Sequence, residues 1–343
     1  MAASKPVGYA VIGLGGFAQR AILPGFKHSK KGKLVALVSG DMLKAKRLAA
    51  KFGAGTFYTY DDLPTCLRDP QVEAVYIATN NGSHARYAVQ AANAGKHVLC
   101  EKPMAISVEE CRLMLAVCRA SDVRLMIAYR KYFEPSSLAL KKLYRSGKLG
   151  RLKYIHSSFG IFLPPRLERG AWHLDPQLSG GGSLPDVGVY CVNTIRWLVG
   201  EEPSEVSAYQ WAANPERFSQ VDENIAFRMD FPSGIVAQCT SSFQAAESSF
   251  LQVHGEKGWA CLNPAFQYDL ERCLFGEIGG RWFEKKFKVI DELALEIDAL
   301  ADCIRRRREP EPDGLQGMRD VAVMEAIYQS ARDGCTVPIN MPE

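Results

Sequence analysis

The chain has 343 residues, more than the roughly 100 to 200 usual for one domain, so two domains are expected. Its 42 Lys and Arg face 38 Asp and Glu, which leaves a formal net charge of +4. This near balance argues against a nucleic-acid partner or an acidic membrane surface. With 47% hydrophobic residues and no apolar run of about 18 residues, the sequence is typical of a globular protein without a membrane span.

The ten cysteines show neither a CxxC pair nor zinc-ligand spacing, and most have apolar neighbours. This usage predicts reduced core thiols in a cytoplasmic, disulfide-free protein. The six histidines lack HxxxH or HxH spacing, so no metal site is expected. The opening stretch MAASKPVGYAVIG enters a strand almost at once, so we expect neither an export signal nor an N-terminal arm.

Short apolar runs alternate with segments of helical period up to about residue 129. The expected strands are GYAVIGLG, KLVALVSG, AVYIAT, HVLCEKP and RLMIAY. Between them lie amphipathic segments such as DMLKAKRLAAKFG and HARYAVQAANAGK, in which Gly53 and Gly95 suit helix C-termini. The alternation predicts an α/β domain with a doubly wound parallel sheet, a Rossmann domain, over residues 1–128.

After about Tyr132 the pattern changes. A helix-like PSSLALKKLYRSGKLG precedes segments of period 2, namely LKYIHSSFGIFL, EVSAYQWAA, ENIAFRMDF, GIVAQCTSSF and SFLQVHGEKGWACL. Two helix-like segments, DELALEIDALADCIRRRR and GMRDVAVMEAIYQSARDG, close the chain. We therefore predict an α+β domain over residues 129–343 with a large, mostly antiparallel sheet. The broad face of that sheet suits a homo-oligomer, as a dimer or a tetramer.

A glycine-rich turn follows the first strand. In VIGLGGFAQRAI, Gly13, Gly15 and Ala18 have G-x-G-x-x-A spacing directly before a helix. The first glycine permits the tight turn, the second lets the backbone approach a pyrophosphate, and the small third residue allows the helix to pack on the strand. Backbone amides at the helix N-terminus then hold the phosphates, so the turn predicts dinucleotide binding.

The end of the second strand indicates which dinucleotide is bound. NAD sites usually place a carboxylate there to bind the ribose hydroxyl, whereas this chain has Ser39 and Gly40, followed by Asp41 and then Lys44. A hydroxyl, a bare glycine and a lysine accept the 2'-phosphate of NADP, which a carboxylate repels. NADP is therefore favoured, and a ribose contact by Asp41 is the alternative.

A lysine follows the fourth expected strand in HVLCEKP. Ligands of open parallel sheets bind beyond the carboxyl ends of the strands, where Lys102 is expected to lie. A cis bond before Pro103 would aim the lysine into the cleft. The alternative for Lys102 is a surface lysine at the start of a helix.

The segment LSGGGSLPDVGVY supplies two further candidates. The glycines at 180 to 182 allow the backbone to approach a ligand closely, and Asp186 and Tyr190 lie at i and i+4 of a helix-like segment. With Lys102 they form a set suited to taking a proton from a sugar hydroxyl while hydride leaves the carbon. The ammonium group would stabilise the phenolate, so that the phenol acts as base near neutral pH. A buried Asp–Tyr core hydrogen bond is the alternative.

Four segments together, GLGGFAQRAILPGF, CEKPMAISVEECRLM, AYRKYFEP and GGGSLPDVGVY, resemble the Gfo/Idh/MocA oxidoreductases. Within that family they are most similar to the branch of glucose-fructose and aldose-aldose oxidoreductases. Tyr190 stands where many members carry His, which points to this branch. The branch often has Arg where this chain has His173, a departure from the pattern.

The resemblance implies roles for named residues. Lys102 matches the catalytic lysine, Asp186 the carboxylate that positions the substrate, and Tyr190 the acid/base. The implied cofactor-binding residues are Gly13, Leu14, Gly15, Gly16, Phe17, Ser39, Gly40, Lys44, Thr79, Asn80, Asn81, His84, Glu101, Lys102, Arg130 and Trp172. The implied activity is NADP-dependent oxidation of a cyclic aldose to its lactone. If NADPH stays bound, a second sugar is then reduced to an alditol.

Alternatives remain for the activity and for three residues. A dehydrogenase for glucose, xylose or a dihydrodiol would exchange NADP at each turnover, and a sugar sensor would bind NADP without catalysis. A sensor is expected to lack the catalytic residues, which this chain retains. His84 is alternatively a helix N-terminal residue without a cofactor contact, Arg130 an ion-pair partner of Glu134, and His173 a surface or capping histidine.

Overall fold

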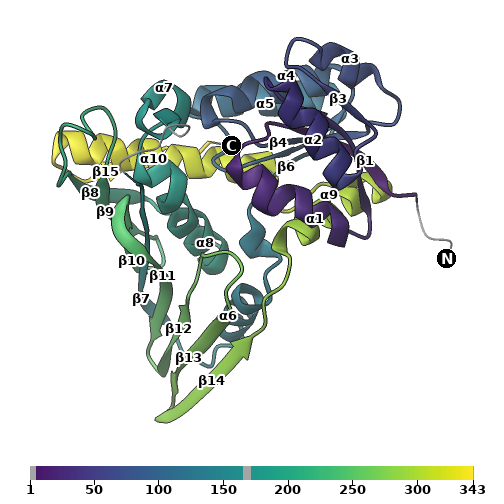
Figure 1. Cartoon of the computed structure of the whole chain (residues 1–343). Helices are drawn as coiled ribbons and strands as arrows, with labels where there is room; N and C mark the ends of the chain where they lie inside the picture. The colour runs from purple at the N-terminus through teal and green to yellow at the C-terminus, as the bar shows by residue number, and fades with distance from the viewer. Residues whose placement is uncertain (1–4, 165–170, 343) are drawn as a thin grey trace. The chain divides into compact units, whose positions relative to one another are not determined.

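A computed structural model describes residues 5–164 and 171–342 (Figure 1). The chain divides into two compact units. The first combines Met1–Arg130 with Asp291–Met318, and the second combines Lys131–Ile290 with Arg319–Glu343. The first segment of the first unit ends at Arg130, and the sequence analysis placed its boundary after residue 128.

The first unit contains a six-stranded sheet in which every neighbouring pair is parallel. Its strands are β1 (Val7–Ile12), β2 (Gly32–Val38), β3 (Thr56–Tyr58), β4 (Ala74–Ile77), β5 (His97–Cys100) and β6 (Leu125–Ile127). Their order is β3-β2-β1-β4-β5-β6, so the chain reverses direction across the sheet between β1 and β4. Ligands of such sheets bind beyond the carboxyl ends of the strands at this reversal.

Helices connect the strands of the first unit. They are η1 (Ala18–Ile22), α1 (Leu23–His28), α2 (Met42–Phe52), α3 (Leu63–Arg68), η2 (Asn81–Ser83), α4 (His84–Asn93) and α5 (Val108–Ala120). The predicted α/β architecture is confirmed. Gly53 caps α2 with a φ of 77°, as expected from its place in the sequence.

One late segment returns to the first unit. Helix α9 (Glu292–Arg306) packs against α1, β2 and β5, whereas the sequence analysis assigned all residues after 128 to the second domain. The Tyr9 hydroxyl donates to the carbonyl of Ile297 at 3.0 Å, and Leu293 fills the space beside Gly25. The parallel sheet and α1 thus bury an apolar helix face from the late part of the chain, where Ile297 lies 288 residues beyond Tyr9.

The second unit contains a nine-stranded sheet of order β14-β13-β12-β11-β7-β10-β9-β8-β15. Its strands are β7 (Leu152–Phe162), β8 (Glu205–Trp211), β9 (Asn224–Asp230), β10 (Val236–Ser242), β11 (Gln244–Gly255), β12 (Gly258–Asn263), β13 (Arg272–Ile278), β14 (Arg281–Phe287) and β15 (Val337–Pro338). Only β7 and β10 pair in parallel among these strands, so the mostly antiparallel sheet is confirmed.

The remaining helices lie mainly in the second unit. They are η3 (Arg130–Tyr132), α6 (Pro135–Arg145), η4 (Ala171–Leu174), α7 (Pro176–Ser179), η5 (Leu184–Gly188), α8 (Val189–Val199) and α10 (Gly314–Asp333). Helix α10 begins in the first unit and continues into the second. Figure 1 shows α6 and α8 along one face of the sheet, and α6 contacts β12 and β13 while α8 contacts β7.

Helix α8 is buried on all sides, and ion pairs fix its C-terminal half. Arg196 pairs with both Asp320 of α10 and Glu202, and the Asn193 side-chain amide donates to Asp320 at 2.7 Å. A charge is stable in a protein interior only when such partners surround it. The helix that carries Tyr190 is therefore held firmly in the second unit.

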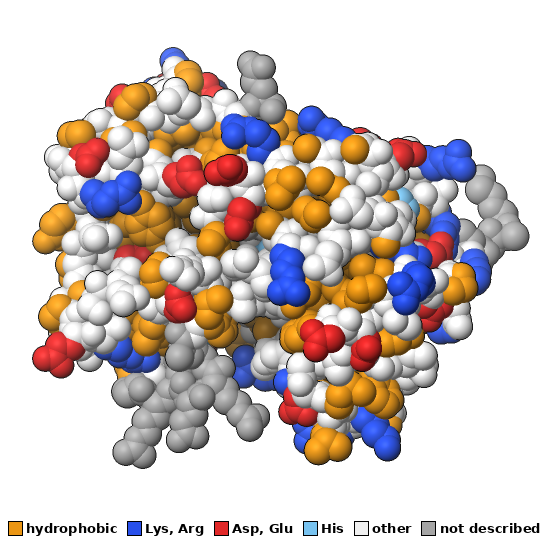
Figure 2. Space-filling model, turned by 90° about the horizontal axis from the view of Figure 1, so that it is seen from above, with side chains coloured by type: hydrophobic (Ala, Val, Ile, Leu, Met, Phe, Trp, Pro, Cys, Tyr) orange, Lys and Arg blue, Asp and Glu red, His pale blue; other side chains and the backbone are white. Residues whose placement is uncertain are grey.

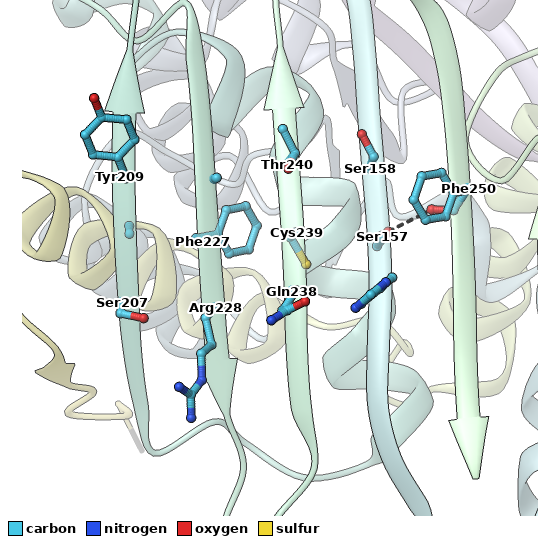
Figure 3. Close-up of a pocket in the computed structure, with 13 residues that line it drawn as sticks. Ser157, Ser158, Ser207, Tyr209, Phe227, Arg228, Gln238, Cys239, Thr240 and Phe250 are labelled. Carbon is cyan, nitrogen blue, oxygen red and sulfur yellow. Dashed lines mark hydrogen bonds between the residues drawn. The ribbon is translucent and has the colours of Figure 1, made fainter.

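The other face of the sheet carries no helix from the described part of its own unit. Ser157 of β7 lies 3.3 Å from Cys191 of α8, so its neighbours His156 and Ser158 point to the opposite face. A hollow of about 770 Å³ lies over β8, β9, β10, β7 and β11, lined by side chains such as Tyr209, Arg228 and Thr240 (Figure 3).

Charged side chains are mixed on the surface. Lysine and arginine are interspersed with aspartate and glutamate over the face drawn in Figure 2, without a broad area of one sign. Among the described residues, no helix combines the length and apolar character needed to span a bilayer.

Candidate active site

The turn after β1 has the bare backbone that a pyrophosphate requires. Gly13 has a φ of +97°, and a Cβ there would lie 2.5 Å from the carbonyl oxygen of Ala78. Gly15 and Gly16 are exposed, with open space where a Cβ would stand. Ala18 is buried under the helix that begins here. The first glycine is thus fixed by the fold, while the next two leave room for a phosphate group.

The end of β2 shows what the ambiguous carboxylate does. Asp41 caps α2, because its Oδ1 accepts a hydrogen bond from the Lys44 backbone N–H at 2.9 Å. The Asp41 N–H in turn donates to the hydroxyl of Ser39 at 3.2 Å. Asp41, whose carboxylate was the argument for NAD in the sequence, is therefore engaged in the cap of α2. Ser39, Gly40 and Lys44 lie around the start of the same helix.

The loop after β4 is tied to the turn after β5 by a buried histidine. His84 Nδ1 lies 3.0 Å from the carbonyl oxygen of Pro103, and Nε2 lies 3.4 Å from that of Thr79. Burial lowers the pKa of His84 to about 4, so the ring is neutral near pH 7. A neutral ring has one N–H, and we assign it to the shorter contact. His84 is thus the first residue of α4 and a link between the two loops.

An orphaned polar atom lies in the same loop. Asn80 Oδ1 is buried and has no hydrogen-bond partner in the structure. Buried polar atoms rarely lack a hydrogen-bond partner. A hydroxyl or amide group of a bound ligand could donate a hydrogen bond to this oxygen. Together with the open turn at Gly15 and Gly16, this acceptor fits a dinucleotide along the carboxyl ends of β1 and β4.

Lys102 lies directly after β5, at the same edge of the sheet. It is half-buried, and its backbone N–H donates to Glu101 Oε2 at 3.2 Å. The Tyr76 hydroxyl donates to the other carboxylate oxygen at 2.9 Å. Burial raises the pKa of Glu101, while the charge of Lys102 acts in the opposite direction. The peptide bond from Lys102 to Pro103 is cis.

Behind this turn lies a buried cluster of charges. Arg130 is 1% exposed and forms an ion pair with Glu292 of α9. The resemblance implies a cofactor contact for Arg130, and in the structure its guanidinium group is buried in this ion pair. Glu134, the alternative partner named from the sequence, caps α6 and accepts a hydrogen bond from Lys131 at 3.1 Å.

One further carboxyl group completes the cluster. Glu296 is fully buried on α9, one turn beyond Glu292, and neither of its oxygens has a hydrogen-bond partner. Burial raises the pKa of Glu296 well above its usual range, and the charge of Glu101 adds to the effect. The group is therefore held as a neutral acid. Sequence reasoning missed it because α9 was assigned to the other domain.

Tyr190 belongs to the second unit, near the start of α8. Its side chain is 6% exposed and packs against the rings of Phe159 and Phe266, with centroids 5.4 and 5.7 Å away. Its hydroxyl lies 3.0 Å from that of Tyr268, so the two phenols share a hydrogen bond. Tyr268 was missed in the sequence because it lies 78 residues away, in a loop without a motif.

Asp186 lies in η5, the π-helical turn directly before α8. His173 Nε2 is 3.9 Å from Asp186 Oδ2, and the ring of Trp172 stacks on His173 with centroids 3.8 Å apart. His173 is therefore placed beside the candidate carboxylate rather than at a helix cap. The second unit thus brings together a carboxylate, an imidazole and an indole from η4 and η5.

Family models match both parts of the chain. The oxidoreductase family with an NAD-binding Rossmann fold matches residues 7–129. The GFO/IDH/MocA C-terminal domain matches residues 137–261. The chain belongs to the Gfo/Idh/MocA oxidoreductase family. Membership explains why the glycine turn and the EKP segment lie in a Rossmann unit, followed by a unit built on a large sheet.

Several Gfo/Idh/MocA relatives align over most of the chain. A D-xylose 1-dehydrogenase [NADP(+)] of Haloarcula marismortui is 33% identical over 99% of this chain and 95% of its own. A trans-1,2-dihydrobenzene-1,2-diol dehydrogenase of Mus musculus is 31% identical over 69% of this chain and 67% of its own. The structure of an aldose-aldose oxidoreductase from Caulobacter crescentus complexed with glycerol superposes with a TM-score of 0.92 at 36% identity, covering 98% of this chain and all of that one.

The neutral Glu296 predicts a specific pH dependence of stability. Its folded-state pKa exceeds its unfolded value near 4.3, so the contribution of Glu296 to the free energy of unfolding falls by about 1.4 kcal/mol per pH unit above that value, until the folded-state pKa is reached. Glu296→Gln removes this loss while keeping the shape. We expect the variant to gain free energy of unfolding relative to the wild type as the pH rises above about 5, measured by urea denaturation at several pH values.

Glu109→Gln is the matched control, because Glu109 is exposed on α5 of the same unit. A Glu296→Gln variant whose stability differs from the wild type by the same amount at every pH would show that Glu296 is not held neutral.

Proposed function

We propose that the protein is an NADP-dependent sugar oxidoreductase. It oxidises a cyclic aldose to its lactone and, with NADP(H) retained, reduces a second sugar to an alditol. The observation that carries the proposal is the phenol of Tyr190, buried among aromatic rings and hydrogen-bonded to a second phenol. The likeness to the Caulobacter aldose-aldose oxidoreductase, 36% identical over nearly the whole chain, supports the pairing of two sugars.

The cofactor is proposed to lie along the carboxyl ends of the parallel strands. The turn from Gly13 to Phe17 would hold the pyrophosphate, and Ser39, Gly40 and Lys44 the 2'-phosphate. The commitment of Asp41 to the helix cap supports NADP over NAD, and the Haloarcula relative named for NADP(+) supports the same choice. When bound, the nicotinamide accepts the hydride that leaves the sugar carbon.

The protons are moved by side chains of this chain. Tyr190 takes the proton of the anomeric hydroxyl as hydride leaves the same carbon, which yields the lactone. Lys102 stabilises the phenolate by its charge, and Asp186 accepts a hydrogen bond from a sugar hydroxyl. In the return half, Tyr190 gives its proton to the carbonyl oxygen of an open-chain sugar. One sugar thus loses a hydride and a proton, and the other gains both.

A second candidate is a dehydrogenase that exchanges NADP at each turnover. The xylose and dihydrodiol dehydrogenases among the relatives favour it. The candidates share the chemistry at Tyr190 and differ in whether the purified protein retains the cofactor. The ten cysteines, all free thiols and mostly buried, support a reducing compartment such as the cytoplasm for either one.

A homo-oligomer is part of the proposal. The helix-free face of the sheet exposes large aromatic side chains, among them Tyr209, 69% exposed, and Trp211, 41% exposed. Exposed apolar patches on a flat sheet often mark interfaces. We expect Trp211→Glu to lower the mass of the assembly, measured by light scattering after gel filtration. An unchanged mass would place the interface elsewhere or show a monomer.

The activity is tested on the dialysed protein without added cofactor. We expect glucose to raise the absorbance near 340 nm by about one NADPH per chain, and a second sugar to reverse the rise. An absence of change, followed by steady NADPH formation once free NADP is supplied, would establish the exchanging dehydrogenase. An absence of any reaction with a panel of sugars would overturn the sugar assignment.

Tyr190→Phe is the matched variant for this test, because it keeps the ring among Phe159 and Phe266 and removes only the hydroxyl. We expect it to bind NADP as the wild type does and to lose at least about 100-fold in turnover. Turnover close to that of the wild type would remove Tyr190 from the acid/base role.

The cofactor choice is tested at α2. Lys44→Ala is expected to weaken NADP binding by about tenfold and NAD binding much less, because only NADP carries the 2'-phosphate. Fluorescence titration with each cofactor measures the ratio. Lys46→Ala, an exposed lysine on the same helix, is the control. Equal weakening of both cofactors in Lys44→Ala would contradict the phosphate contact.

A further inference from the structure

The helix that carries both Asp186 and Tyr190 lacks an N-cap of its own. Helix η5 runs directly into α8, so residues 184–199 form one continuous helix. Ser183 stands at the N-cap position, but its side chain makes no hydrogen bond to the helix. The first N–H groups of a helix need acceptors from elsewhere. The Leu184 N–H finds one in Asp222 Oδ2, at 2.9 Å and 38 residues away.

Asp222 receives three further hydrogen bonds. The Gly182 N–H donates to Oδ1 at 2.7 Å, the Ser183 hydroxyl donates to Oδ2 at 2.7 Å, and the Tyr328 hydroxyl of α10 donates to Oδ1. The residue is 6% exposed. Burial raises the pKa of Asp222, while its four donors act in the opposite direction. One carboxylate thus joins the glycine loop, the helix start and α10.

The two preceding glycines make this arrangement possible. A Cβ at Gly182 would lie 1.8 Å from the carbonyl oxygen of Asp222. A Cβ at Gly181, whose φ is +144°, would lie 2.0 Å from the Tyr328 hydroxyl. The sequence analysis expected these glycines to let the backbone approach a ligand. In the structure their closest approaches are to Asp222 and Tyr328, so their absence of side chains serves the contact with this carboxylate.

We propose that Asp222, held by Tyr328, is the positioning residue that sets the place of Asp186 and Tyr190. The inference rests on the proposed function, in which these two residues meet the sugar. Asp222 fixes the first turn of the helix, Asp186 lies two residues beyond Leu184, and Tyr190 follows about one turn later. The side chain of Ser241 on β10 lies against the same turn, 3.0 Å from the Ser183 hydroxyl.

The chemical consequence follows from how strongly proton and hydride transfer depend on geometry. A displacement of about 1 Å at a reacting group can cost about 100-fold in rate. Without the Asp222 carboxylate, two contacts still hold the helix start. The Ser183 hydroxyl contacts Ser241, and the Ser183 N–H donates to the backbone carbonyl of residue 222 at 3.0 Å. We therefore expect the loss of the carboxylate to affect the chemical step more than the binding of NADP, because all the proposed NADP-binding residues except Trp172 lie in the other unit.

Asp222→Asn is the direct test. An amide keeps the size but places an NH₂ group opposite donors that need an acceptor. We expect kcat with sugar to fall by at least about tenfold, with NADP affinity within about twofold of the wild type. Amide hydrogen exchange over residues 182–190 should accelerate by about tenfold or more. Tyr328→Phe removes one of the four donors and should show smaller effects in the same direction.

Asp230→Asn is the matched control, because Asp230 is a carboxylate on β9, the strand that follows Asp222, and its side chain pairs with the exposed Arg228. An exchange rate over residues 182–190 in Asp222→Asn equal to that of the wild type would show that Asp222 does not hold the helix start. Faster exchange with an unchanged kcat would overturn its positioning role. Hydrogen exchange is measured without substrate. If the wild-type protein oxidises no sugar but exchange is faster in the variant, the proposed function is refuted, while the hold of Asp222 on the helix start stands.

Discussion

The arrangement of both candidate half-sites depends on one constraint: polar groups removed from water must be bonded to partners inside the fold. In the first unit His84 satisfies it by joining the loop after β4 to the turn that carries Lys102. In the second unit Asp222 satisfies it by collecting four donors. Neither residue needs to touch a ligand to matter, because each fixes the backbone on which a candidate residue stands.

The same constraint distinguishes polar groups that are bonded within the fold from a buried polar atom that is not. Arg130 is paired with Glu292, and Asp41 is engaged as a helix cap. Asn80 Oδ1 has no partner, and the glycine turn leaves open space at Gly15 and Gly16. The unsatisfied acceptor and the bare backbone lie at the carboxyl ends of the strands, where the topology of the sheet favours a ligand.

Much of this was predictable because the relevant signals are local in the sequence. Buried parallel strands show as short apolar runs, and the glycine spacing and the EKP segment each lie within a few residues. Strands β13 and β14 were missed because one face of each is solvated, and the charged RWFEKKF gives a weak apolar signal. Strand β3 has three residues at the sheet edge, too few for a pattern.

The residues that were missed have partners far away in the chain. Tyr268 meets Tyr190 across 78 residues, and Asp222 meets Leu184 across 38. No spacing rule connects such pairs, since the sheet alone determines which loops adjoin. Asp41 is the opposite case: its role as a cap is local, and the helix that begins at Met42 contains the signal, but the sequence also allowed a ribose contact.

The return of residues 291–318 to the first unit has a consequence for how this family member can be altered. The Rossmann unit is not one contiguous stretch, so the backbone crosses between the units after residues 130, 290 and 318. A fragment ending near residue 130 would lack α9 and would expose the apolar faces of α1 and β2 that this helix covers. The nucleotide-binding half is therefore not a transplantable module, and recombination with relatives must exchange both of its segments together.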